Sequence, residues 1–187
     1  MAMLNRFSKK SAVRFGLLAL LVLAACQRGP EKLAPPCPVI GIVQDAASLT
    51  LFVPGPGRDL TDMTLEAEIT EFDGFCDTDV DEDDGTGSVE IDLRLLFSAM
   101  RGPAAVSREA QISYFIAVTD QKENILAREI FSFDFEFEGN RNRIGYTDET
   151  IQTIPIRSGQ VGEDFKILIG MQLNEEQLTY NRNNRGR

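Results

Sequence analysis

Within Ile125–Phe137, apolar and polar side chains alternate strictly from Phe131 onward. Four phenylalanines occupy every second position at the end of this stretch, and serine, aspartate and glutamate fill the positions between them. A period of two places alternate residues on one face of a β-strand, whereas an α-helix would spread them around its axis. The stretch therefore predicts a strand whose buried face is formed by Phe131, Phe133, Phe135 and Phe137.

Six further stretches show strand-like patterning and are separated by glycine, proline or polar turn residues. They are Pro38–Val43, Met63–Thr70, Ser88–Phe97, Ala110–Val118, Thr150–Ile154 and Phe165–Leu173. Helical features are limited to single turns at Asp45–Leu49, with Asp45 as the expected N-cap, and at Asn174–Leu178. A chain with about seven short strands and no long amphipathic helix is predicted to be all-β.

We expect a single antiparallel β-sandwich of about seven strands, and an immunoglobulin-like arrangement is one form that it could take. The sequence contains no tryptophan, so the Cys–Trp–Cys core of antibody domains is absent. A lipocalin-type barrel is the alternative, although it would usually need more strands. A phenylalanine stripe on such a strand forms the core far more often than it lines a ligand pocket.

The N-terminal residues carry the features of an export signal. Residues 1–14 contain four basic and no acidic side chains, and the 11-residue apolar run Phe15–Ala25 follows them. This run is well short of the ~20 residues that cross a bilayer as a helix. A basic segment, a short apolar helix and small residues in this order predict a secretory signal peptide over residues 1–25.

The last four residues of this region, Leu23-Ala24-Ala25-Cys26, resemble the lipobox of bacterial lipoproteins. The resemblance implies cleavage before Cys26 and a diacylglyceryl thioether on its sulfur, usually with an acylated amine. Two or more acyl chains anchor a protein stably, so the covalent lipid on Cys26 would hold the chain on a membrane. Gln27, in place of aspartate, favours the outer membrane by the sorting rule of enteric bacteria, with the domain facing the periplasm. An ordinary signal peptide followed by an incidental cysteine is the alternative.

The expected organisation is a signal peptide (1–25), a lipidated tether with three prolines (26–36), a β-sandwich domain (37–180) and a polar, basic, disordered tail (181–187). Within the domain, three stretches resemble a group of uncharacterised proteobacterial lipoproteins. They are GRDLTD at Gly57–Asp62, MRGPAA at Met100–Ala105 and YNR at Tyr180–Arg182. That group has no assigned activity, so the resemblance implies no mechanism.

With Cys26 assigned to lipid, Cys37 and Cys76 remain. Two cysteines in an exported chain predict one disulfide bond. The bond would close a loop of about 40 residues and contribute roughly 4 kcal/mol in the chain-entropy model. A zinc site is the weaker interpretation, because two cysteines in a chain without histidine supply too few ligands.

The domain is expected to be strongly acidic. The whole chain has a net charge of −10, and removal of the four positive charges of the predicted signal leaves −14. Such a surface disfavours nucleic acid and anionic lipid headgroups as partners. It favours basic protein segments or divalent cations, or it serves solubility.

The densest group of carboxylates lies in Asp77–Gly87, which we expect to be an acidic loop between strands. Carboxylates grouped on a loop are suitable ligands for Ca²⁺. The candidate ligands are Asp77, Asp79, Asp81 and Asp83. An EF-hand register fails, because its sixth position requires glycine and would hold Glu82 or Asp84. A solvated acidic loop without a metal ion is the more frequent arrangement.

No catalytic constellation is visible. The sequence contains no histidine and no Gly-x-Ser-x-Gly motif, and nucleophilic catalysis needs an activated nucleophile and a base. We therefore expect no enzyme and no cofactor beyond the covalent lipid. Four arginines in loops could meet at one end of the domain, namely Arg101, Arg141, Arg143 and Arg157.

The function that we expect is that of a membrane-anchored binding or assembly module of the bacterial envelope. Its partners would be the membrane, through the lipid, and another envelope protein, but not nucleic acid. Exposed edges of the predicted sheets could add a strand from the partner. A small-ligand or calcium-dependent binding protein is the alternative.

Overall fold

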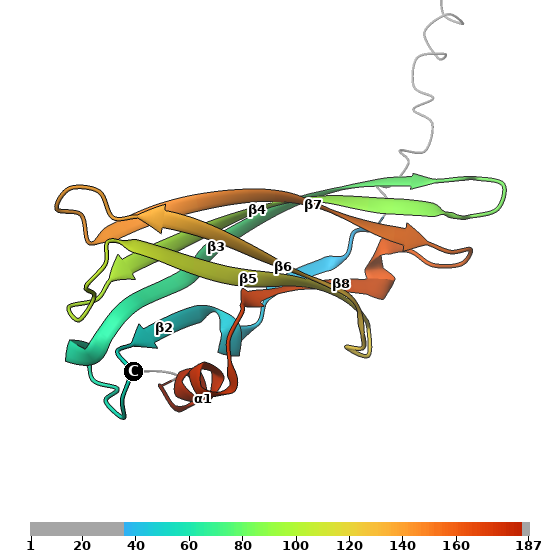
Figure 1. Cartoon of the computed structure of the whole chain (residues 1–187). Coiled ribbons are helices and arrows are strands. Elements are labelled where there is room, and N and C mark those ends of the chain that lie inside the picture. The colour runs from blue at the N-terminus through green and yellow to red at the C-terminus, as the bar shows by residue number, and fades with distance from the viewer. Residues whose placement is uncertain (1–35, 185–187) are drawn as a thin grey trace, which may run out of the picture. The chain divides into compact units, whose positions relative to one another are not determined.

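The computed structural model describes residues 36–184, which form two four-stranded β-sheets packed face to face (Figure 1). We name them sheet I and sheet II. Sheet I has the order β1-β8-β5-β6, with bounds Val39–Ile42, Phe165–Met171, Glu109–Asp120 and Ile125–Glu136. Sheet II has the order β2-β3-β4-β7, with bounds Ser48–Phe52, Met63–Val80, Gly87–Arg101 and Arg143–Ile156. Neighbouring strands are antiparallel except for β1 and β8, which are parallel.

Short helical segments connect or follow the strands. They are the 3-10 helices η1 (Gln44–Ala46), η2 (Leu60–Asp62) and η3 (Gly162–Asp164) and the α-helix α1 (Glu175–Asn184). Within residues 36–184, no helix is long and apolar enough to cross a membrane. The predicted signal peptide, Cys26 and the tether up to residue 35 lie outside the described residues and stay predictions.

The inward faces of the two sheets form one core. Along β4, every second side chain from Val89 to Ala99 is buried. Side chains of β5 and β8 in sheet I meet them, and the rings of Phe97 (β4) and Tyr114 (β5) lie 5.0 Å apart between the sheets. The predicted β-sandwich is therefore confirmed, because period-two patterning buries one face of each sheet.

The phenylalanine stripe of β6 contributes to this core. Phe137, just after the strand, is buried, whereas Phe131, Phe133 and Phe135 are partly buried because β6 is the last strand of sheet I. The ring of Phe133 stacks on that of Tyr146 of β7, with centroids 4.0 Å apart. Aromatic side chains thus cover the core where the edge strands β6 and β7 of the two sheets adjoin.

Residues 36–184 contain eight strands, and the one that the sequence pattern missed is β2. We expected only a helical turn at Asp45–Leu49. The turn is present but shorter, since η1 ends at Ala46 and its N-cap is Val43 instead of Asp45. The sheet orders also differ from the immunoglobulin arrangement, in which the first, second, fourth and fifth strands form one sheet.

Strand β3 continues to Val80, well beyond the expected end at Thr70. A β-bulge between Ile69 and Glu71 shifts the alternation, so that Thr70 and Glu71 are both exposed. The predicted acidic loop Asp77–Gly87 is therefore wrong in extent. Residues 77–80 belong to β3, and residues 81–86 alone form the turn of the β3–β4 hairpin.

The C-terminal segment is helical. Since α1 covers Glu175–Asn184, the prediction of a disordered tail is wrong for residues 181–184, and residues 185–187 lie outside the described part. The Nδ2 atom of Asn181 donates to the carbonyl oxygens of Asp45 (2.9 Å) and Ser48 (2.8 Å). These partners are 136 and 133 positions away from Asn181 in the sequence. The contacts that hold this helix therefore cannot be predicted from local sequence patterns.

The predicted disulfide between Cys37 and Cys76 is present, with Cα atoms 6.1 Å apart. Cys37 stands just before β1 and Cys76 lies within β3. The bond therefore links the first strand of sheet I covalently to sheet II.

A hydrogen bond between the sheets involves Tyr114. Its side chain is fully buried, and its hydroxyl donates to Oδ2 of Asp148 on β7 at 2.7 Å. Burial, and then the neighbouring carboxylate, raise the pKa of Tyr114 well above its usual value. The neutral phenol is thus the form that the folded state stabilises.

The variant Tyr114→Phe is expected to lower the free energy of unfolding by about 1–3 kcal/mol, because Asp148 loses its donor. Since the folded pKa exceeds the unfolded value of about 10, wild-type stability should fall as the pH rises above about 10. The variant should lose this contribution to the pH dependence. Urea denaturation at neutral and alkaline pH measures both effects.

Tyr146→Phe is the matched control, because it keeps the ring that stacks on Phe133. It should change the free energy of unfolding by less than about 0.5 kcal/mol. Equal losses in the two variants would contradict the role given to the Tyr114 hydroxyl.

Candidate functional site: a groove on the outer face of sheet II

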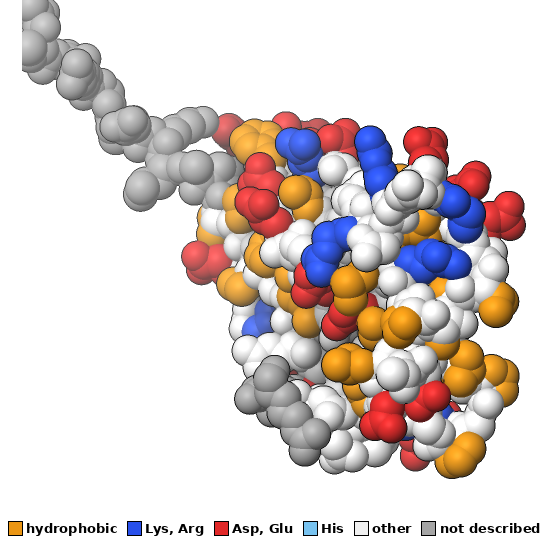
Figure 2. Space-filling model, turned by 90° about the vertical axis from the view of Figure 1, so that its left-hand side faces the viewer, with side chains coloured by type: hydrophobic (Ala, Val, Ile, Leu, Met, Phe, Trp, Pro, Cys, Tyr) orange, Lys and Arg blue, Asp and Glu red, His pale blue; other side chains and the backbone are white. Residues whose placement is uncertain are grey.

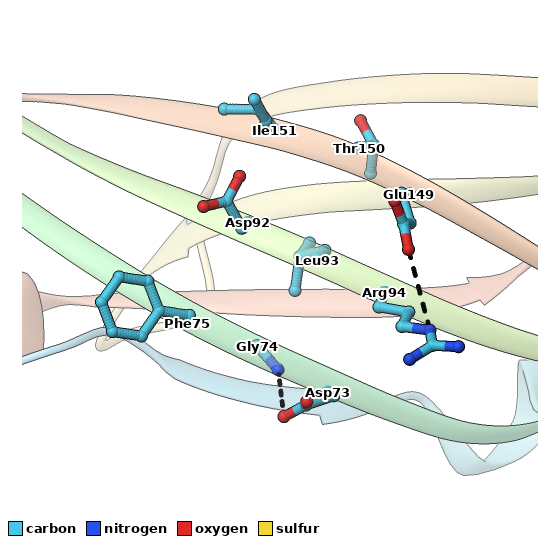
Figure 3. A pocket seen from close by; sticks show the side chains of 9 residues that line it. All are labelled: Asp73, Gly74, Phe75, Asp92, Leu93, Arg94, Glu149, Thr150 and Ile151. Carbon is cyan, nitrogen blue, oxygen red and sulfur yellow. Dashed lines mark hydrogen bonds and ion pairs between the residues drawn. The ribbon is translucent and has the colours of Figure 1, made fainter.

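A groove of about 680 Å³ crosses three adjacent strands of sheet II, β3, β4 and β7 (Figure 3). Two cross-strand rows line it. One row is Phe75, Asp92 and Ile151, and the next is Asp73, Arg94 and Glu149. All six side chains are exposed, because residues two apart on a strand project from the same face and here that face is turned away from the core.

Two large apolar side chains stand in this groove. Phe75 is 69% exposed and Ile151 is 57% exposed, whereas Leu93, which also contributes to the lining, is 2% exposed. In the register of the strands, Asp92 lies between Phe75 and Ile151. The groove therefore presents a carboxylate flanked by two apolar side chains.

The outer face around the groove is strongly acidic. On the five cross-strand rows from Glu71 to Asp79, seven side chains are acidic and one is basic. The acidic residues are Glu71, Asp73, Asp77, Asp79, Glu90, Asp92 and Glu149, and the basic one is Arg94. This imbalance creates a negative potential at the surface that attracts cations.

The negative charge of these side chains is hardly neutralised by basic side chains on the same face. Nε of Arg94 lies 3.8 Å from Oε1 of Glu149, and both side chains are mostly exposed, so the pair contributes little to stability. Asp77 is directly opposite Glu90 in the β3–β4 ladder. Like charges in this position are destabilising by about 0.2–1 kcal/mol. These two pairs therefore contribute little to the stability of the isolated domain.

The four aspartates that we named as candidate calcium ligands are separated by the fold. Asp77 and Asp79 project from β3, whereas Asp81 and Asp83 lie in the hairpin turn. In the turn, Oδ1 of Asp81 accepts a hydrogen bond from the backbone N–H of Asp83 at 2.7 Å. Within the part of the chain that the structure describes, no group of three or more aspartate, glutamate, cysteine or histidine residues is placed to hold a metal ion. The calcium hypothesis thus gains no ligand set and stays a prediction.

A second carboxylate stabilises the same turn. Oδ1 of Asp84 accepts from the backbone N–H and from the hydroxyl of Thr86, at 2.8 and 2.7 Å. These two bonds lower the pKa of Asp84. Carboxylates of the turn are therefore used to hold the hairpin.

Three of the four arginines that we expected in loops lie at one end of the domain, although Arg101 is the last residue of β4 and Arg143 the first of β7. The backbone N–H of Arg101 donates to the carbonyl of Asn142, which lies between Arg141 and Arg143. Arg157 follows the other end of β7 and does not join them. Figure 2 views this end of the domain and shows basic side chains interspersed with acidic and apolar ones.

The arginines of this end hold loops together. Arg101 donates from Nε and Nη2 to the carbonyl oxygens of Ser107 (2.9 Å) and Ala105 (2.6 Å). Arg108, which we did not single out in the sequence, donates from Nε to the carbonyl of Phe137 at 2.8 Å. Because these guanidinium groups bind the protein's own backbone, we do not assign them to a partner.

The three stretches on which the resemblance to uncharacterised lipoproteins rests have local structural roles. In Gly57–Asp62, the side chains and backbone N–H groups of Asp59 and Asp62 cap η2 reciprocally. In Met100–Ala105, the N–H of Gly102 donates to the carbonyl of Thr64 at 2.9 Å. A Cβ atom on Gly102 would lie 2.1 Å from the carbonyl oxygen of Met63, so only glycine fits there.

The third stretch, Tyr180–Arg182, docks α1 on the domain. The ring of Tyr180 contacts that of Phe52 with centroids 5.1 Å apart, and Nε of Arg182 lies 3.0 Å from Oδ2 of Asp45. Arg58 of the first stretch pairs with Glu176 of α1 and lies over the same Phe52 ring. The first and third stretches therefore adjoin, and their contacts explain them as parts of the scaffold.

Comparisons of the chain with protein-family models, with curated proteins and with solved structures found no match.

The residues of the groove were not identified as a site from the sequence. We expected Phe75 to follow the strand Met63–Thr70 and to help fix the end of that strand to the first strand, and Glu149 lay outside the predicted strand Thr150–Ile154. Recognising the bulge at Thr70 would have placed Phe75 on the outer face, because the alternation changes phase there. The available signal in the sequence was the spacing of acidic residues at alternate positions, namely Glu71, Asp73, Asp77 and Asp79.

Proposed function

We propose that this chain is a lipid-anchored protein of the bacterial envelope, facing the periplasm, whose β-sandwich binds another envelope component. Cys26 would carry the lipid, and the groove on sheet II would carry the binding. The proposal includes no catalytic step. Its support is the signal-like N-terminus together with the composition of the groove.

The observation that carries the proposal is the placement of Phe75 and Ile151 on either side of Asp92. Burying apolar surface contributes roughly 25 cal/mol per Å², so a partner that covers both side chains gains affinity from them. Aromatic side chains surrounded by weaker contacts dominate the binding energy of many interfaces. Phe75 is therefore the expected centre of the interface.

The charge of the same face defines the class of partner. Seven carboxylates against one arginine would repel nucleic acid and anionic lipids, and would accelerate association with a positively charged protein segment. A lysine or arginine placed over Asp92 would relieve the repulsion between neighbouring carboxylates. We therefore propose a basic protein segment with an adjacent apolar side chain as the occupant of the groove.

A crosslinking pull-down of the full-length protein from its native envelope tests this function. Phe75→Ser is expected to reduce recovery of the partner by roughly tenfold, since an interface of this kind depends on its aromatic anchor. Leu60→Ser is the matched control, because Leu60 is also highly exposed, at 77%, but lies in η2 and outside the groove. Equal recovery of the partner with the wild type, Phe75→Ser and Leu60→Ser would contradict the assignment of the groove as the binding site.

The Cys26→Ala variant tests the anchor separately. We expect this variant to lose the partner in intact cells, because it is no longer held at the membrane. Adding the same variant to opened envelope preparations should restore recovery of the partner to the wild-type level. Together, these results would show that the lipid determines where the protein is and that the groove provides the affinity. Membrane retention of the Cys26→Ala protein would contradict the lipid anchor but leave the groove untouched.

Calcium titration distinguishes this proposal from the calcium-dependent alternative. With the acidic residues dispersed along strands, we expect millimolar Ca²⁺ to act only as a screening ion. Isothermal titration calorimetry should then show no saturable binding, and Asp81→Asn should leave the response unchanged. A saturable signal that Asp81→Asn abolishes would favour a calcium-dependent protein instead.

A further inference from the structure

The first half of β6 is exposed on both faces. All six residues from Ile125 to Ile130 are exposed, including three large apolar side chains, Ile125 (64%), Leu126 (55%) and Ile130 (56%). Within residues 36–184, β6 pairs with β5 along one edge and with no strand along its other edge. An unpaired edge of this kind is a template for a further strand.

The opposite edge of sheet I is much shorter. It is formed by β1, which has only four residues and follows the disulfide-linked Cys37. Very short edge strands protect a sheet from pairing with another chain, whereas the 12 residues of β6 offer a long edge. At β6 the protection is limited to a bulge near Ile125 and to the charges of the strand, and from Ala127 onward the ladder with β5 is regular.

We infer that β6 pairs with β6 of a second copy of this chain in an antiparallel arrangement, which joins the two copies of sheet I into one continuous sheet. A two-fold axis beside Phe131 aligns almost the whole strand with its copy. In this register, Arg128 lies opposite the partner's Asp134, and the same pair forms again on the other side of the axis. Ile130 lies opposite the partner's Ser132.

Charge complementarity is one of two features that favour this register. Arg128 and Asp134 are on the outer face of sheet I, the face on which Ser132 contacts Ser113 of β5. Opposite charges directly across an antiparallel ladder stabilise the pairing, and like charges oppose it. The neighbouring symmetric register, centred on Ile130, would place Arg128 opposite Ser132 and leave both charges without a complement. The register centred on Ser132 would place Arg128 opposite the partner's Glu136, but it pairs only residues 128–136, whereas the register centred on Phe131 pairs residues 126–136. Charge complementarity and strand overlap together therefore favour the register centred on Phe131.

Both charged side chains contact residues of their own sheet. The guanidinium carbon of Arg128 lies 4.6 Å from the centroid of the Phe115 ring, and its Nη2 donates to Oε1 of Gln172 at 2.6 Å. Oδ1 of Asp134 accepts from Nε2 of Gln111 at 2.9 Å. These contacts hold both side chains on the side of β5 and β8, so pairing with the copy requires them to turn toward the free edge of β6. The second oxygen of Asp134 and the remaining donors of Arg128 are available for the partner.

A charge-swap series on the full-length protein tests the inference by sedimentation and native mass spectrometry at concentrations from about 1 to 100 μM. Wild type should be a dimer. Arg128→Asp and Asp134→Arg should each raise the dissociation constant at least about tenfold, because like charges then face each other. The double variant with both changes should restore dimerisation. Glu90→Lys, on sheet II, makes a charge reversal away from β6 and should leave the dimer unchanged.

Hydrogen exchange locates the contact in the same samples. Amides of β6 should become protected as the concentration rises, and those of β7 should not. A wild-type protein that stays monomeric, a dimer without protection of β6, or a double variant that fails to recover while its thermal unfolding is normal would each overturn the inference. Protection of β6 only after an envelope extract is added would also overturn it, since the added strand would then come from another protein.

Discussion

Replacing Cys37 and Cys76 together by alanine is expected to lower the free energy of unfolding by about 4 kcal/mol. The disulfide closes a loop of 39 residues, and its removal increases the conformational entropy of the unfolded chain. The native state should also loosen at one place. Strand β1 has four residues and pairs only with β8 among the described strands, so the bond to β3 is its covalent support.

Denaturant unfolding of the oxidised wild type, the reduced wild type and the double-alanine variant measures this effect. The reduced wild type and the double-alanine variant should have the same free energy of unfolding, because both lack the disulfide bond. Amides of β1 should exchange faster in both, with little change in β4. A loss below about 1 kcal/mol would contradict the view that this cross-link stabilises the junction between the two sheets.

Replacing Phe97 by alanine is expected to destabilise the domain by about 3–5 kcal/mol. Phe97 is 3% exposed, and its ring contacts the rings of Tyr114 and Phe133 at centroid distances of 5.0 and 5.3 Å. Truncation would leave a cavity between the sheets, lined by side chains of both. Thermal and urea unfolding of the variant measure the loss.

Phe75→Ala is the matched control on the neighbouring strand. The residue type and the substitution are the same, but Phe75 is 69% exposed on the outer face. Its loss should change the free energy of unfolding by less than about 1 kcal/mol. A destabilisation as large as that of Phe97→Ala would mean that Phe75 belongs to the core and that the groove is incorrectly assigned. A small change combined with loss of the partner separates binding from stability.

The elements predicted correctly from the sequence are those whose alternation is long and uninterrupted. In β4, β5 and β8, the large buried side chains occupy every second position along the whole strand. The positions of these residues in the sequence therefore identify the buried face directly. The disulfide followed from the count of cysteines together with the predicted export signal. The sandwich followed from these strands together.

The elements that were missed depend on interactions between distant residues. The bulge at Thr70 reverses the parity of β3, and its ladder with β4 stabilises a strand through Asp77 and Asp79 that local propensity disfavours. Most of β7 was missed because its inward positions include Asp148 and Gln152, which become acceptable only beside partners such as Tyr114. Polar residues on both faces of a strand remove the period-two signal.

The candidate site was missed for the same reason. Phe75 is apolar and would be assigned to the core by any rule that uses hydrophobicity alone. Ile151 alternates with buried residues in β7 and looks unremarkable in the sequence. Only the register of three strands brings Phe75, Asp92 and Ile151 into one row.

The most direct test of the central claim is site-specific photocrosslinking in the native envelope. A photoreactive residue is placed at position 75, at position 151, or at position 60 in η2 as the control. The account predicts that positions 75 and 151 form an adduct with the same basic protein, and that high salt weakens both adducts, because screening reduces the attraction of the acidic face. No adduct at positions 75 and 151, or equal adducts at all three positions, would contradict it.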